Sequence, residues 1–226
     1  MIRFIVKLSE IVNNDPRVNQ KLKVVYVEDY RVSLAELMIP SADISEQISL
    51  AGTEASGTSN MKFMINGAVT LGTLDGANVE IHEAVGDENI ILFGMTTPEV
   101  NDLKKRGYHP GVIAENNAVI RHALRELGRG FGGVDFRDIV ESLSTKDPYM
   151  VLADFDSYCK AQNRARELYL DQTGWQKKCL VNIANAGRFA ADRSIRDYAN
   201  NIWNANPLPK KTVVSPKPVP APKKRK

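Results

Sequence analysis

The sequence has little cysteine, few histidines and no long apolar run, and each of these shortages excludes a class of protein. Its two cysteines, Cys159 and Cys179, are too few for a disulfide framework and lack metal-ligand spacing, so a reducing, cytoplasmic setting is expected. No stretch approaches the roughly 20 apolar residues that span a bilayer, and the first residues are not typical of a secretory signal peptide. We therefore predict no membrane segment. The three histidines form no cluster, so we also predict no metal site.

The composition is that of an ordinary globular protein, but the charge is unevenly distributed. Of 226 residues, 43% are hydrophobic and 25% are charged, and no internal repeat is evident. Residues 207–226 contain seven Lys or Arg, no acidic residue and six of the eleven prolines, so the net charge of +3 becomes −4 without them. Such a segment buries too little apolar surface to fold, and we predict a disordered Pro/Lys-rich tail. We interpret its terminal basic residues as solvated rather than as a nucleic-acid patch or localisation signal.

Apolar periodicity predicts alternating strands and helices. We expect helices over 2–13, 31–38 and 59–68, strands over 22–27, 69–71, 79–81 and 90–93, and a short strand or turn over 43–48. From residue 97 onward the pattern is helical, with breaks at 107–111 and 128–133. This order favours an α/β fold with an open parallel sheet covered by helices. The expected organisation is a domain over 1–150, a helical section over 151–206 and the tail over 207–226.

The most informative segment is Glu54-Ala-Ser-Gly-Thr-Ser-Asn-Met-Lys-Phe-Met-Ile-Asn66, a small flexible turn followed by a helix-forming run. Thr58 and Lys62 are four residues apart and therefore share one face of a helix. A helix N-terminus favours a phosphate, and a lysine amine beside it is what a Schiff-base cofactor such as pyridoxal phosphate requires. Spacing alone favours an ordinary capped helix with a solvated lysine, because Gly-rich turns before helices are common.

The residues themselves resemble the pyridoxal-phosphate attachment segment of the glycogen/α-glucan (maltodextrin) phosphorylase family. The similarity continues through residues 28–36, 43–49, 72–81 and 93–95, and returns at 182–184, 192–195, 198–199 and 202–203, so it covers about residues 1–204. Ile65 stands where the family usually has Leu or Met, an apolar exchange that we expect to have little effect.

The resemblance implies both a fold and an activity. The fold would be the C-terminal, Rossmann-like half of a GT-B glycosyltransferase, incomplete here and followed by a helical C-terminal section. The activity would be the reversible transfer of a glucosyl unit from the non-reducing end of an α-1,4-glucan to orthophosphate, giving glucose 1-phosphate. The cofactor would be pyridoxal 5′-phosphate, whose phosphate takes part in proton transfer; its second pKa, near 6, suits that task.

The resemblance also assigns cofactor-binding residues. Lys62 would attach the cofactor, and Gly57 and Thr58 would bind its 5′-phosphate at the start of the helix. Tyr30 and Arg31 would contact the cofactor, with Arg31 supplying positive charge near the phosphate.

A second set of residues would bind the sugar. Glu54, Ser56 and Gly57 are implied to hydrogen-bond the hydroxyls of the transferred glucosyl unit. Asp75 and Asn78, which lie further along the chain, are most simply interpreted as turn residues.

The sequence lacks parts that the family carries. The family's basic segment Lys-Arg-x-His-Glu-Tyr-Lys and its N-terminal domain have no counterpart here. We therefore expect a segment of a longer enzyme or one half of a split gene, inactive alone, with exposed apolar patches and sheet edges. Its partners would be a complementary N-terminal half or, as in the full-length family, a second copy in a homodimer.

Two alternatives remain open. The chain could be a non-catalytic module that holds pyridoxal phosphate or docks onto a complementary half. It could also be an unrelated pyridoxal-phosphate enzyme such as an aminotransferase. An aminotransferase would need an Asp for the pyridine nitrogen and an Arg for a substrate carboxylate.

Overall fold

A computed structural model describes residues 1–206, and the chain divides into two compact units. The first unit, Met1–Arg188, contains the sheet and most of the helices, and the second begins at Phe189. The tail predicted for 207–226 lies outside the described residues. Within the part that is described, no helix is both long and apolar enough to cross a membrane.

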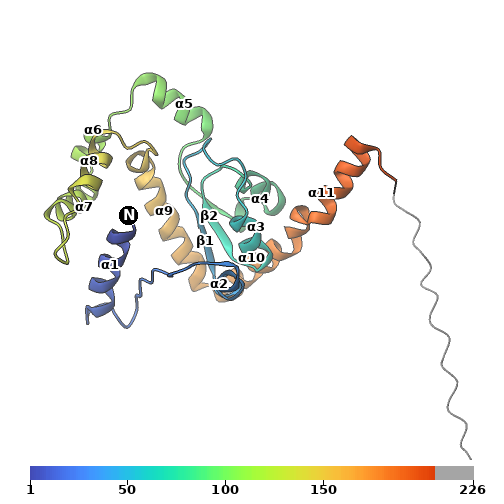
Figure 1. The fold of residues 1–226 in the computed structure, drawn as a ribbon, viewed down its shortest axis with the longest axis horizontal. Helices are drawn as coiled ribbons and strands as arrows, with labels where there is room; N and C mark the ends of the chain where they lie inside the picture. The colour runs from blue at the N-terminus through green and yellow to red at the C-terminus, as the bar shows by residue number, and fades with distance from the viewer. Residues whose placement is uncertain (207–226) are drawn as a thin grey trace, which may run out of the picture. The chain divides into compact units, whose positions relative to one another are not determined.

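A three-stranded parallel sheet forms the centre of the first unit (Figure 1). Its order is β1 (Ile44–Gln47), β2 (Val69–Gly72), β3 (Ile91–Leu92), so the strands are neighbours in their sequence order. Ile44 lies opposite Val69, and Leu71 lies opposite Ile91. The expected mixed α/β fold is confirmed, as are the strands predicted within 69–71 and 90–93, and the ambiguous segment 43–48 forms a strand.

Helices make up most of the first unit. Those that precede or connect the strands are α1 (Ile2–Asn14), α2 (Val32–Met38), α3 (Ser59–Ile65) and α4 (Asn78–Val85). Those that follow the sheet are α5 (Thr97–Arg106), α6 (Pro110–Asn116), α7 (Ala118–Arg129), α8 (Arg137–Thr145), α9 (Val151–Leu170) and α10 (Gln172–Asn185). Short 3-10 turns occupy Ile39–Ser41, Asp87–Asn89 and Ala186–Phe189. The helices predicted at 2–13, 31–38 and 59–68 are confirmed, the last one ending three residues earlier.

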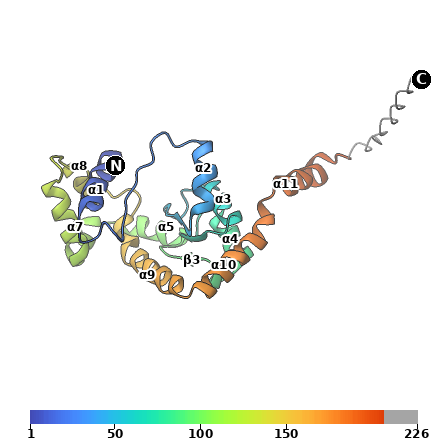
Figure 2. The same ribbon diagram turned by 90° about the horizontal axis from the view of Figure 1, so that it is seen from below.

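The core of the unit lies between the sheet and helices α9 and α10. Val69 and Leu71 point to the same face of β2, because strand side chains alternate, and both are fully buried. They pack with Ile91 against Trp175 of α10 and against Ala161 and Ala165 of α9. Figures 1 and 2 show α3 on the side of the sheet opposite α9. Each large apolar side chain buried in this way contributes about 1.5–3 kcal/mol to folding.

The strand predicted over Leu22–Val27 is wrong. This segment has no regular structure, and Leu22 and Val25 are 52% and 72% exposed. Its backbone is held by a side chain instead of a strand: Asn13 Nδ2 donates to the carbonyl of Val24 at 2.8 Å, and the Val24 N–H donates to Asn13 Oδ1 at 2.9 Å. An apolar run becomes a strand only where another strand offers its edge, and no described strand runs beside this one.

The strand predicted over Val79–Ile81 is also wrong, because these residues belong to α4. Ile81 and Val85 are buried while Val79 is exposed, which is the four-residue spacing of a helix face. Gly86, with φ of +75°, ends the helix. Over three residues, Val79 and Ile81 on either side of a glutamate fit both the two-residue period of a strand and the period of a helix. Only a longer segment distinguishes a strand from a helix.

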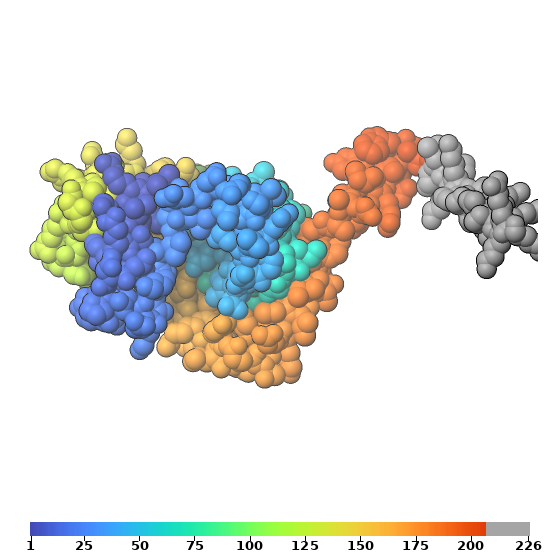
Figure 3. Space-filling view, turned by 60° about the horizontal axis from the view of Figure 1, so that its bottom comes forward, coloured from blue at the N-terminus to red at the C-terminus, as the bar shows by residue number. Residues whose placement is uncertain are grey.

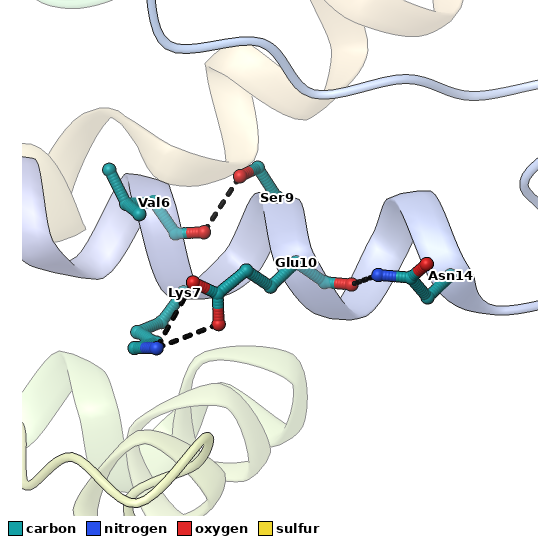
Figure 4. Close-up of polar contacts among 5 residues, drawn as sticks. All are labelled: Val6, Lys7, Ser9, Glu10 and Asn14. Atoms are coloured by element: carbon teal, nitrogen blue, oxygen red, sulfur yellow. Dashed lines mark hydrogen bonds and ion pairs between the residues drawn. The ribbon is translucent and has the colours of Figure 1, made fainter.

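Helix α1 is held to the first unit by aromatic contacts. Phe4 meets the rings of Phe131 and Phe136 edge-on, with ring centres 5.8 and 5.6 Å apart. The helix also carries local polar contacts (Figure 4): Lys7 Nζ pairs with Glu10 at 2.7 Å. Because such exposed pairs contribute little, the aromatic cluster is what fixes α1.

The described part of the second unit is helical. It contains α11 (Ala191–Tyr198), followed by a π-helical turn over Ala199–Trp203. The rings of Tyr198 and Trp203 stack with centres 5.4 Å apart.

Candidate functional site

The loops after β1 and β2 meet at the carboxyl edge of the sheet. The Thr73 N–H, just past β2, donates to the carbonyl of Gln47 at 3.1 Å, and the Thr73 hydroxyl donates to the carbonyl of Ser49 at 2.7 Å. In open parallel sheets, ligands bind outside this edge. We call residues 48–58 the motif loop. The sugar-binding residues predicted from the sequence, Glu54, Ser56 and Gly57, lie on it.

Asp75 organises the motif loop. Its carboxylate accepts hydrogen bonds from the backbone N–H groups of Gly52 at 2.8 Å and Glu54 at 2.9 Å, and from the Ser49 hydroxyl at 2.9 Å. Burial opposes ionisation, but the hydrogen bonds outweigh it, and the pKa of Asp75 is lowered. Asp75 is 6% exposed, so it is a buried anion that holds the loop and not a simple turn residue.

Two buried amides connect α3 to α4. Asn60 Nδ2 donates to Asn78 Oδ1 at 3.1 Å, and Asn78 Nδ2 donates to the carbonyl of Thr73 at 3.0 Å. Both residues are 2% exposed. Since a buried amide without partners costs about 1–3 kcal/mol, this chain of hydrogen bonds fixes where α3 begins.

Close backbone packing brings the two loops together at Gly76. Its φ is +51°, and a Cβ added there would lie 2.6 Å from the carbonyl oxygen of Ser56. The neighbouring Ala77 N–H donates to that same oxygen at 2.7 Å. Gly57 also has a positive φ, +85°. Only glycine satisfies both demands at position 76.

The outer side of the motif loop is open. Glu54, Ser56 and Thr58 are exposed, and the Ser56 hydroxyl donates within the loop, to the carbonyl of Gly57 at 3.2 Å. Thr58 occupies the N-cap position of α3, yet its side chain forms no capping hydrogen bond. The Thr58 side chain therefore satisfies none of the backbone donors in the first turn of α3, although Asn60 Oδ1 accepts from the Met61 N–H at 2.9 Å.

Lys62 lies on the exposed side of α3, beside a groove of about 330 Å³ between α2 and α3. The groove is lined by Val32, Ala35, Glu36, Ile39, Pro40, Lys62, Ile65 and Asn66. No residue within 1–206 forms a hydrogen bond or an ion pair with Lys62 Nζ. The amine is therefore accessible at the rim of a largely apolar groove.

Tyr30 and Arg31 come directly before α2, but neither lines this groove. Arg31 donates to the carboxylate of its neighbour Asp29 at 2.6 Å, and Tyr30 is 59% exposed. Figure 3 shows α2 and the segment before it on the surface of the first unit. The structure thus places α2 beside Lys62 and directs Arg31 toward Asp29.

The sequence did not reveal Asp75, Asn60 and Asn78 as organisers of this site. The signal available was an Asp-Gly turn directly after a strand, which predicts the turn but not a carboxylate pointing back across it. Among the residues that the structure describes, no group of His, Cys, Asp and Glu could hold a metal ion.

Comparison with known proteins identifies the family. A family model described as carbohydrate phosphorylase matches residues 1–205. The glycogen phosphorylase of Synechocystis sp. is 46% identical over 212 residues, which are 92% of this chain and 25% of that protein. The liver form of the human glycogen phosphorylase is 46% identical and the muscle form 45%, each over 211 residues and 25% of its length. The chain thus spans about a quarter of the length of these relatives, and it belongs to the carbohydrate phosphorylase family.

Proposed function

We propose that this chain is the cofactor-attaching segment of an α-1,4-glucan phosphorylase. The complete enzyme would transfer a glucosyl unit from the glucan to orthophosphate and release glucose 1-phosphate. The observation that carries the proposal is the family match over residues 1–205, which includes the motif loop and Lys62. The parallel sheet, with this loop at its carboxyl edge, supports a Rossmann-like half of a GT-B fold.

The residues present fit pyridoxal phosphate. Lys62 offers an amine without a partner among residues 1–206, beside a groove large enough for a small molecule. The positive φ of Gly57 and the missing side-chain cap at Thr58 leave the start of α3 open to a phosphate. Tyr30 and Arg31 stay part of the proposal, and Arg31 would exchange Asp29 for the cofactor phosphate.

Each residue has a defined task in this proposal. Lys62 attaches the cofactor, and Gly57 and Thr58 hold its phosphate. Glu54 and Ser56, kept in place through Asp75, hydrogen-bond the hydroxyls of the glucosyl unit. When bound, the cofactor supplies a phosphate with a second pKa near 6, which can exchange a proton close to neutral pH.

The isolated chain is proposed to be inactive and to function with a complementary polypeptide or as part of a longer one. Leu22, Val25 and Val32 are 52%, 72% and 76% exposed, an apolar surface that a partner would cover. A second candidate, a non-catalytic module that binds the cofactor or docks onto a partner, rests on this same surface. We also propose that the complete enzyme is a homodimer and that it acts in the cytoplasm.

A chimera distinguishes the two candidates. In the Synechocystis glycogen phosphorylase, the matching segment is replaced by residues 1–205 of this chain. We expect phosphate-dependent release of glucose 1-phosphate from a glucan, and its loss in the same chimera carrying Lys62→Ala. A chimera that folds and binds pyridoxal phosphate but releases no glucose 1-phosphate would support the non-catalytic module.

A further inference from the structure

A second groove, separate from that of Lys62, opens where α9 begins. It has a volume of about 250 Å³ and lies between the segments after β1 and β3 and the first turns of α9. Ile48 and Leu50 line it from the motif loop, and Phe93 lines it from the position directly after β3. Asp154 and Tyr158 line it from α9, and Tyr149 lies just before the N-cap residue of that helix. It is an apolar groove with one carboxylate in its wall.

The carboxylate of Asp154 is buried but only half satisfied. It is 8% exposed, and Oδ1 accepts a hydrogen bond from the Met95 N–H at 2.9 Å. Among residues 1–206, no donor reaches Oδ2. Nearby Asp147, 1% exposed, accepts from the Tyr108 hydroxyl and from the backbones of Val151 and Leu152 at 2.6, 3.0 and 2.9 Å. The contrast indicates that Oδ2 of Asp154 is available for a ligand.

The charges around this carboxylate are of one sign. Burial raises the pKa of Asp154, the hydrogen bond from Met95 lowers it, and the nearby carboxylates of Asp147 and Glu99 raise it further. No described Lys or Arg forms an ion pair with Asp154. A buried carboxylate of this kind is stabilised by a positive charge, which nothing in the described chain supplies.

Aromatic rings surround the groove. Phe93 and Tyr158 meet edge-on with ring centres 5.2 Å apart, and the Tyr158 hydroxyl donates to Glu46 at 3.0 Å, which fixes its ring. Tyr149 and Ile48, 66% and 60% exposed, form the rim. Aromatic faces attract organic cations, and apolar walls accept their carbon skeletons.

We propose that this groove binds a small organic ammonium ion, with its nitrogen on Asp154 Oδ2 and its carbon skeleton between Phe93, Tyr149 and Tyr158. The small volume favours a compact amine over a protein segment, of which it would admit only one side chain. This site does not depend on Lys62 or on the proposed phosphorylase activity.

The test is a titration of the isotope-labelled, full 226-residue chain with 2-phenylethylammonium, followed through the backbone amide signals of Gly94 and Met95. We expect both signals to shift, and 2-phenylethanol, the neutral analogue, to bind about tenfold more weakly. Asp154→Asn should weaken amine binding about tenfold and leave alcohol binding unchanged. Asp156→Asn, which removes an exposed charge from the same helix, should change neither.

Each of the following results would overturn the proposal. Equal binding of the amine and the alcohol would show a purely apolar groove. Equal weakening by Asp154→Asn and Asp156→Asn would show general attraction to an acidic surface. No shift with the amine, together with a shift on adding a blocked Leu-Lys-Leu tripeptide, would assign the groove to a protein segment. If Asp154→Asn fails to fold, Tyr149→Ala at the exposed rim serves instead, and unchanged amine binding in that variant would also contradict the proposal.

Discussion

The carboxylate of Asp75 accepts a hydrogen bond from the backbone N–H of Glu54 at 2.9 Å, across 21 residues of sequence. This contact joins the turn after β2 to the motif loop, with Gly52 and Ser49 bound to the same carboxylate. The proposed sugar-binding residues therefore take their position from a buried anion. Their geometry depends on a residue that touches neither sugar nor cofactor in the proposal.

Replacing Asp75 by Asn should destabilise the fold and loosen the motif loop. An amide in that place turns an N–H group toward backbone donors, and we expect a loss of about 1–3 kcal/mol in the free energy of unfolding. Urea denaturation measures the loss, and hydrogen exchange at Glu54 reports on the loop. Asp102→Asn is the control, because that carboxylate is 65% exposed on α5, and an equal loss there would contradict the account.

The same carboxylate should make stability depend on acid pH. The pKa of Asp75 in the folded chain lies below the ordinary value of 3.8, so its contribution is fully present above that value. It is lost as the pH falls through the lower, folded-state pKa. The difference in unfolding free energy between the native chain and Asp75→Asn should therefore shrink below pH 3.8, and a difference independent of pH would argue against an ionised Asp75.

Gly72 should not tolerate a side chain. A Cβ there would lie 2.6 Å from the backbone carbonyl of Gln47 on β1, where neither strand can yield without breaking their pairing. We expect Gly72→Ala to lower the unfolding free energy by about 1–3 kcal/mol. Gly187→Ala is the matched control, since a Cβ at that position meets nothing within 4 Å. Equal melting temperatures of the two variants would contradict the described register.

Asn13 should hold the segment before α2. Its side chain satisfies both backbone groups of Val24, so Asn13→Ala should cost about 1–2 kcal/mol and speed hydrogen exchange at Val24. The neighbouring Asn14 donates to the carbonyl of Glu10 in its own helix (Figure 4), so Asn14→Ala should leave hydrogen exchange at Val24 unchanged. Similar exchange at Val24 in both variants would show that Asn13 does not anchor the segment.

Local sequence predicted the parts of the fold that depend on local pattern. The helices around Lys62 and near the N-terminus, and the strand that contains Val69, followed from periodicity. Leu22–Val27 has the composition of a strand, but whether it forms one depends on whether another strand lies beside it. No local pattern reveals that. Val79–Ile81 is too short to distinguish the period of a strand from that of a helix. The buried Val85, four residues after Ile81, is what indicates a helix.

In the candidate site, too, the features set by neighbouring residues could be predicted from the sequence, and those set by long-range contacts could not. The motif predicted Lys62 as the attachment residue, which stays a prediction, and the start of its helix, which the structure confirms at Ser59. Both followed from residues that are neighbours in sequence. The groove beside Lys62 is formed by α2, which lies more than 20 residues earlier in the chain. The role of Asp75 depends on a contact across the carboxyl edge of the sheet. Such long-range contacts are set by tertiary packing, and the sequence window around either residue does not contain them.

The most direct test of the central claim is to incubate the chain with pyridoxal phosphate, reduce it with borohydride and map the modified peptides. The account predicts that the reduced cofactor is found on Lys62, and that Lys62→Arg removes it without changing the fold. The absence of labelling, or labelling spread evenly over exposed lysines such as Lys104 and Lys160, would contradict the claim that this chain carries the attachment site.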